Sequence, residues 1–160
     1  YKMNGAKVTV EGGNKEFTLK LRVPKWAENF KVSVGGQEVE TQNENGYFAI
    51  TKVWDKEVVE IKYTAPVKTW VLNGKVAFTK GAITLARDIR LDDIKKPLDM
   101  TVKNGKTVRA KVVENTKFKS NLTVEIQTKD GVITLCDYSQ AGKNYDDENS
   151  MITVWQDIKK

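Results

Sequence analysis

Histidine is absent from this 160-residue sequence. The commonest general base of enzymes and the commonest protein ligand for metals are therefore missing. A Ser-His-Asp triad and a Cys/His zinc site are both excluded within the chain. A single cysteine, Cys136, also excludes an internal disulfide. We therefore expect no catalytic residues, no metal and no cofactor.

Long apolar runs are absent too. No stretch approaches the ~18 apolar residues that a membrane-spanning helix needs, so we expect no membrane partner. The chain begins at Tyr1 without a basic and apolar leader. We interpret it as a fragment or a processed product of a longer protein.

The charge is basic but dispersed. The net charge of +6 results from 27 Lys and Arg against 21 Asp and Glu. Adjacent lysines occur only at Lys95-Lys96 and Lys159-Lys160, whereas nucleic-acid sites need a clustered basic stripe with aromatic residues. We expect a solvated lysine surface and no nucleic-acid partner.

Alternation of apolar and polar residues dominates the chain. Phe17, Leu19, Leu21 and Val23 alternate with polar residues, which is typical of a half-buried strand. About a dozen such segments occur, and only residues 87–97 lack the pattern. The sequence predicts an all-β protein with almost no helix, folded as one or two packed antiparallel β-sandwich units of jelly-roll or immunoglobulin-like type.

Turn residues separate the predicted strands. Asn73-Gly74 and Asn104-Gly105 are strong hairpin dipeptides because both residues accept positive φ. Asp130-Gly131 predicts a third hairpin. We place a first sandwich unit at residues 1–72 and a second at residues 73–149.

Cys136 and the acidic clusters are poor catalytic candidates. Cys136 ends an apolar segment and has no histidine to activate it, so we interpret it as a buried structural residue. Asp92-Asp93 and Asp146-Asp147-Glu148 are the dense acidic clusters. Neither has the spacing of a calcium loop, which favours solvated acidic loops.

Aromatic residues are the better candidates for ligand binding, because exposed rings stack on sugars. Trp54 and Trp70 lie near predicted turns, and Tyr138 and Tyr145 lie in or beside the long polar loop at residues 139–150. We name these four as candidate carbohydrate-binding residues, although packing remains the alternative for each. Trp26 and Trp155 are read instead as core or interface residues. The loop itself is the predicted functional surface.

Short strings along the chain resemble one known family. They keep the family's order and span most of the sequence: Leu19–Ala27, Val32–Gly36, Gly46–Trp54, Lys75–Gly81, Asp137–Asn144 and Met151–Trp155. Together they resemble the C-terminal β-sandwich region of glycoside hydrolase family 127, the former DUF1680 group. The chain departs from the family pattern at Gly35, at Ala82 and after Trp54.

The resemblance implies a division of labour. In that family the chemistry belongs to an N-terminal (α/α)-barrel with a glutamate and a cysteine–zinc cluster, and none of that barrel is present here. Two β-sandwich units follow the barrel, and the final strand returns to the first. By this analogy residues 150–160 would complete the first unit.

These observations lead to one functional hypothesis and a rival. The first is a non-catalytic accessory region that braces the catalytic barrel of an arabinofuranosidase-like glycoside hydrolase. The rival is a free-standing carbohydrate-binding module. Expected partners are the missing barrel, a glycan or a second copy of the chain, and the expected location is extracytoplasmic in a bacterium.

Overall fold

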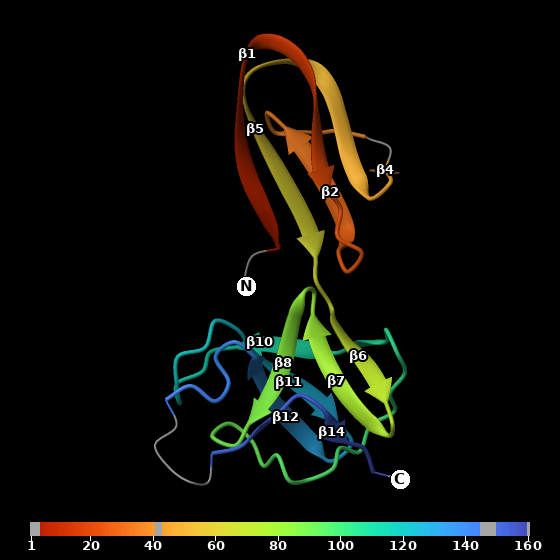
Figure 1. The fold of residues 1–160 in the computed structure, drawn as a ribbon, viewed down its shortest axis with the longest axis vertical. Helices are drawn as coiled ribbons and strands as arrows, with labels where there is room; N and C mark the ends of the chain where they lie inside the picture. The colour runs from red at the N-terminus through yellow and green to blue at the C-terminus, as the bar shows by residue number, and fades with distance from the viewer. Residues whose placement is uncertain (1–3, 41–42, 145–149, 160) are drawn as a thin grey trace. The chain divides into compact units, whose positions relative to one another are not determined.

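The computed structural model of the chain describes residues 4–40, 43–144 and 150–159. Within these ranges the chain forms strands and turns and contains no helix (Figure 1). None of these residues belongs to a helix that could cross a membrane. The chain divides into two compact units, an N-terminal unit at residues 3–65 and a C-terminal unit from residue 66 onward. The all-β prediction is confirmed.

Two long strands form most of the N-terminal unit. β1 (Gly5–Arg22) and β5 (Tyr47–Thr64) pair in antiparallel orientation from one end to the other. The other edge of β5 pairs with β2 and β4, and β3 pairs with β2. The bounds of these short strands are Glu28–Val34 for β2, Gln37–Glu38 for β3 and Asn43–Glu44 for β4.

A bend in the middle of β1 and β5 encloses the core of this unit. The register between the strands shifts between Glu11 and Lys15, and Gly13 and Asn14 there have φ of 59°. Such an irregularity bends strands and increases their twist, and Figure 1 shows the pair curving over. The halves of the bent pair, with β2, bury one apolar cluster: Val10, Leu21, Val32, Phe48, Ile50, Trp54 and Val59.

One antiparallel sheet runs through the C-terminal unit, in the order β10-β11-β12-β8-β7-β6-β9. Its strands are β6 (Val67–Leu72), β7 (Lys75–Lys80), β8 (Ile83–Asp88), β9 (Thr107–Val108), β10 (Ala110–Val113), β11 (Thr123–Thr128) and β12 (Gly131–Asp137). The structure has turns at or near the three predicted positions: at Asn73-Gly74, at Asn104-Gly105 and between β11 and β12. The last of these turns centres on Lys129 and Asp130, one residue before the predicted position.

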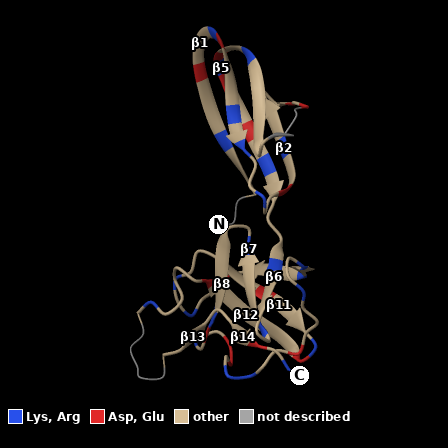
Figure 2. Ribbon diagram, turned by 45° about the vertical axis from the view of Figure 1, so that its right-hand side comes forward, with Lys and Arg blue, Asp and Glu red and all other residues tan. Residues whose placement is uncertain are grey.

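The sheet curves so that its two ends form layers around one core. Figures 1 and 2 both show β7 and β8 lying across β11 and β12. The core cluster draws on both layers: Val67, Val76, Phe78, Leu85, Leu98, Leu122, Val124, Ile126, Ile133 and Leu135. This layering agrees with the predicted sandwich. Lys and Arg are spread over the strands and loops of each unit (Figure 2).

The C-terminal segment inserts between β7 and β8 where these strands diverge. β13 (Ile152–Thr153) pairs with β8, and β14 (Gln156–Asp157) pairs with β7. β7 and β8 run in opposite directions, and each part of the segment is antiparallel to the strand that it pairs with. The two parts therefore run in opposite directions, and the segment reverses at residues 154–155. The structure therefore places this segment in the C-terminal unit, whereas the family resemblance implied its return to the first unit.

The boundary between the units also differs from the predicted one. It lies between Ala65 and Pro66 rather than after Leu72. The reason is the tight Asn73-Gly74 turn, which pairs β6 with β7 along its full length and so binds residues 67–72 into the C-terminal sheet. Residues 98–102 form no strand, and Leu98 makes only an isolated bridge with Ile158.

Candidate functional site on the C-terminal unit

Trp54 is a core residue and not a ligand-binding one. Its side chain is 0% exposed in the N-terminal unit. Its indole N–H donates to the carbonyl oxygen of Phe17 at 3.0 Å, and its ring stacks on the Phe17 ring at 5.7 Å. No face of the ring is left for a sugar, so the prediction for Trp54 is corrected. Its signal lay in the alternation of β5, because Phe48, Ile50 and Trp54 share one buried face.

Trp70 lies on the surface, as expected for a binding residue. It occupies the face of β6 that points away from the core and is 44% exposed. Its direct neighbour across the ladder is Ala77 on β7. The indole N–H donates to the hydroxyl of Thr79, also on β7, at 2.9 Å. This bond holds the ring across the strand boundary.

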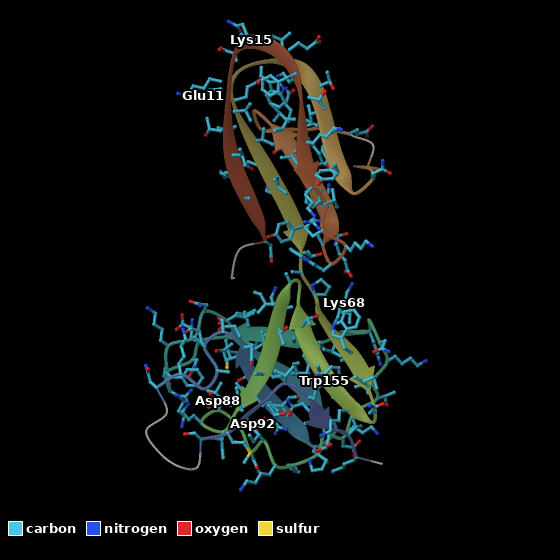
Figure 3. The ribbon with its side chains drawn as sticks, viewed as in Figure 1. Glu11, Lys15, Lys68, Asp88, Asp92 and Trp155 are labelled. Atoms are coloured by element: carbon cyan, nitrogen blue, oxygen red, sulfur yellow. The ribbon has the colours of Figure 1, made fainter. Side chains whose placement is uncertain are left out.

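Trp155 is exposed as well, whereas the sequence was read as burying it. It lies in the inserted C-terminal segment and is 40% exposed (Figure 3). The next residue, Gln156, is buried opposite Val76 of β7. Trp155 therefore lies beside β7, on the side away from β6 and Trp70. Tryptophan is usually buried and glutamine usually exposed, and here the two are reversed. The sequence therefore gave no signal that Trp155 is exposed.

The buried position of Gln156 is explained by its hydrogen bonds. Its amide nitrogen donates to the carbonyl oxygens of Thr153 and Val154 at 2.8 and 3.2 Å. Its amide oxygen accepts from Arg87 at 3.3 Å. Buried amides persist only when satisfied in this way. These bonds close the reversal at residues 154–155 and fix the position of Trp155.

Tyr138 lies at the end of β12 and is 53% exposed. Its backbone N–H donates to the carbonyl of Thr84 on β8. Thr84 pairs with Thr79, the residue that binds the Trp70 indole. Tyr138 and Trp70 therefore belong to neighbouring rows of the same sheet. Tyr145, the fourth candidate, lies outside the described residues.

Two buried aspartates anchor the described start of the long loop. Asp137 accepts the backbone N–H groups of Asn121 and Leu122 at 3.0 Å each, and the Ser139 hydroxyl at 2.6 Å. Asp88 accepts the backbone N–H of Gly142 at 3.1 Å. A carboxylate that receives several N–H bonds is strongly stabilised. The residues after Tyr138 are thus held in place against the sheet.

Arg90 completes this anchor. Its guanidinium forms a two-pronged pair with Asp88, at 2.9 and 2.7 Å. It also donates to the carbonyl of Lys143 at 2.9 Å and lies 3.8 Å from the centre of the Phe118 ring. Asp88 and Asp92 both lie near the end of β8 (Figure 3).

Cys136 is buried between these groups as a free thiol. Burial raises the pKa of the thiol to about 12, and the nearby carboxylates of Asp88 and Asp137 add to the increase. The thiolate is the reactive form of cysteine, so the thiol is inert near neutral pH. The interpretation of Cys136 as a structural residue is confirmed.

The acidic cluster Asp92-Asp93 is occupied by structural bonds. Asp92 accepts from the Arg87 guanidinium at 3.1 Å and from the Thr134 backbone at 3.3 Å, and Asp93 accepts from the Lys95 backbone at 3.1 Å. Both border a cavity of about 250 Å³. Among the residues described here, no group of three could hold a metal ion. The cluster at 146–148 lies outside the described ranges.

Comparison with known proteins now bears on the N-terminal unit. Residues 2–65 match the family model described as the middle domain of GH127 β-L-arabinofuranosidases. This match covers the N-terminal unit almost exactly as the structure bounds it. The resemblance to family 127 is confirmed.

Solved structures agree at the level of the fold. The GH127 β-arabinofuranosidase BT3674 aligns over 99% of this chain at 23% identity and a TM-score of 0.73. Ara127N-Se, a GH127 β-L-arabinofuranosidase from Geobacillus stearothermophilus T6, aligns over 98% at 17% identity and a TM-score of 0.70. The present chain spans only 30% and 29% of the lengths of those two chains. Comparison with curated protein sequences gave no match.

The strings that resemble family 127 are structural in the N-terminal unit. The Pro24–Ala27 turn closes by a bond from the Ala27 N–H to the Pro24 carbonyl, and Trp26 packs edge-on against Tyr63 at 5.4 Å. Gly46 has a positive φ of 83° and accepts the N–H of Val23. These residues form turns and core contacts.

Proposed function

We propose that this chain is the non-catalytic β-sandwich region of a family 127-like glycoside hydrolase and that it braces the catalytic domain of that larger protein. The match of residues 2–65 to the GH127 middle domain carries the proposal. Solved family members of more than three times this length contain the same two-unit fold. By analogy with their printed names, the parent protein would act on β-L-arabinofuranosides.

The chemistry of the chain supports a non-catalytic role. Histidine is absent from the sequence, and its one thiol is buried and protonated at neutral pH. Hydrolysis of a glycoside ordinarily uses two carboxylates that flank a cleft. Asp88, Asp92 and Asp137 are each engaged by arginine or backbone N–H groups, so they hold the fold together.

A bracing role can be tested in the larger protein. A substitution that unfolds this region, such as Trp54→Ala, should lower the temperature at which arabinofuranosidase activity is lost. The KM measured below that temperature should stay unchanged, because the substituted residue lies in the core of an accessory unit. If the thermal inactivation of the parent does not move, this region does not brace the catalytic domain.

A second assay tests the non-catalytic claim directly. The 160-residue chain alone should release no arabinose from a chromogenic arabinofuranoside, while the parent protein does. Turnover by the isolated chain would contradict the proposal. The expectation of an extracytoplasmic bacterial protein stays a prediction.

A further inference from the structure

The burial of Ala77 shows how Trp70 lies on the sheet. Ala77 is on the outer face of β7, between the core residues Val76 and Phe78, yet its side chain is only 4% exposed. Its direct neighbour, Trp70, begins on β6 and donates its indole N–H to Thr79 on β7. A ring attached to one strand and hydrogen-bonded to the next lies across both rather than upright. One face of the indole covers the sheet, and the other faces solvent.

Trp155, on the other side of β7, is also exposed to solvent. Gln156 pairs with Val76 of β7, so Trp155, the residue before it, lies beside β7 on the edge away from β6 and Trp70. β7 lies between the two tryptophans, and two strand spacings are about 10 Å. Two linked sugar rings span a similar length. Two exposed indoles beside one strand form an apolar patch of the kind that marks interaction sites.

Among the polar groups beside the tryptophans, Lys68 lies directly opposite Thr79 on the same face. The groups described next are uncharged or paired. Thr79 on β7 pairs with Thr84 on β8, and the backbone N–H of Tyr138, after β12, donates to the Thr84 carbonyl. These three residues form the cross-strand row next to that of Trp70 and Ala77. On the other flank, the Lys75 ammonium is paired with the Asp157 carboxylate at 3.0 Å. Hydroxyl groups next to flat apolar rings suit a ligand that has both C–H faces and hydroxyl groups. A neutral sugar has this combination, whereas an apolar protein surface lacks the hydroxyls.

We propose that this face of the C-terminal unit, made by Trp70, Ala77 and Trp155 with Thr79 and Tyr138 beside them, binds a neutral oligosaccharide. The two indoles stack on two of its sugar rings, and the hydroxyl side chains receive or donate hydrogen bonds at its edge. The site needs no catalytic domain, so it is independent of the bracing role. In the parent protein it would hold the polysaccharide that carries the arabinofuranose groups.

Isothermal titration of the 160-residue chain tests this directly. The probes are neutral hexasaccharides of glucose, xylose, mannose and arabinose, with a hexamer of galacturonate as the charged comparison. We expect at least one neutral probe to bind with a dissociation constant in the micromolar to millimolar range, and more tightly than the galacturonate. Absence of binding to every neutral probe at millimolar concentration would overturn the proposal.

Substitutions then locate the site. Trp70→Ala and Trp155→Ala should each weaken binding about tenfold, the effect of one ring contact. Thr79→Val keeps the Trp70 ring but removes the bond that orients it, so a smaller loss is expected. Trp26→Phe, in the N-terminal unit, is the matched control and should leave binding unchanged. Circular dichroism verifies that every variant is folded.

Two results would assign the face to something else. Unchanged sugar affinity in the Trp70→Ala, Trp155→Ala double variant would show that binding occurs elsewhere. A concentration-dependent dimer in sedimentation velocity that the same double variant abolishes would mean that a second copy covers the indoles. Either result overturns the proposal without bearing on the bracing role.

Discussion

The indole N–H of Trp54 donates to the backbone carbonyl of Phe17 at 3.0 Å, and the two rings stack 5.7 Å apart. The two residues are 37 positions apart in the sequence, on β5 and β1. They lie beside the bend where both long strands turn over. The contact joins the strands at the point where their ladder is irregular. Trp54 therefore joins β1 to β5 beside the bend of the N-terminal unit.

Truncating Trp54 should unfold the N-terminal unit preferentially. Trp54→Ala removes a fully buried ring and should lower the free energy of unfolding by about 3–5 kcal/mol. Trp54→Phe keeps much of the packing but leaves the Phe17 carbonyl without its donor, which costs about 1–3 kcal/mol. Urea unfolding, with amide exchange at Val10 and Ile50 as the local probe, measures both. Trp70→Ala, an exposed tryptophan, is the control and should change stability far less.

Gly12 should be irreplaceable although its neighbour is not. A Cβ at Gly12 would clash with the carbonyl oxygen and the Cβ of Trp54, so the backbone would have to move. Gly12→Ala should therefore cost about 1–3 kcal/mol by overpacking. Gly13 has open space around it and φ of +59°. Gly13→Asn should be nearly neutral, because asparagine tolerates that backbone region. Equal thermal shifts for the two variants would contradict this account.

Alternation in the sequence predicted the strands well but not their partners. The alternation from Phe17 to Val23 predicted one strand, whereas β1 begins at Gly5 and continues to Arg22 with an irregularity at Gly12 and Gly13. A period of two indicates that one face is buried and says nothing of which strand covers it. The C-terminal segment shows the same limit. Its apolar residues were recognised, but its insertion between β7 and β8 depends on long-range contacts.

Only part of the candidate site could be predicted, because the exposure of a residue also depends on long-range contacts. Trp70 and Tyr138 were identified as exposed aromatic residues because each lies at a strand end or a turn. Trp54 was misplaced because it was interpreted as lying near a turn, although its position matches the buried face of β5. Trp155 was missed because its exposure depends on Gln156, whose burial is satisfied by Arg87 and by backbone carbonyls. That network joins residues far apart in the sequence.

Cys136 should resist thiol reagents until the chain unfolds. With a pKa of about 12, the thiolate fraction at pH 8 is on the order of one in 10⁴, because each pH step below the pKa lowers it tenfold. Burial slows the reaction further. Labelling with an aromatic disulfide at pH 8 should be complete within minutes in urea and negligible over the same period in buffer. Rapid labelling of the folded chain would contradict the buried placement.

The same pKa makes alkaline stability a second measurement on Cys136. The folded pKa is about 12, above the unfolded value of 9.0, so the folded chain keeps a proton that the unfolded chain releases. Stability from this group is fully present below pH 9 and is lost as the pH rises toward 12. Cys136→Ser shifts the hydroxyl pKa out of this range, so its alkaline loss should be shallower. Parallel curves for the two proteins would show that the thiol proton is not retained.

Arg90 should matter far more than an exposed ion pair on the same chain. Its guanidinium pairs with Asp88, whose side chain is fully buried, so removing the arginine leaves a carboxylate in the interior with its main partner gone. Arg90→Met should cost about 3–5 kcal/mol. Lys31→Met breaks the exposed pair with Glu38 and should cost less than about 1 kcal/mol. The loss should also release the loop, so amide exchange at Gly142, which bonds to Asp88, should accelerate in Arg90→Met and stay unchanged in Lys31→Met. If Arg90→Met left both stability and exchange intact, Asp88 would have to be held by its backbone donors alone.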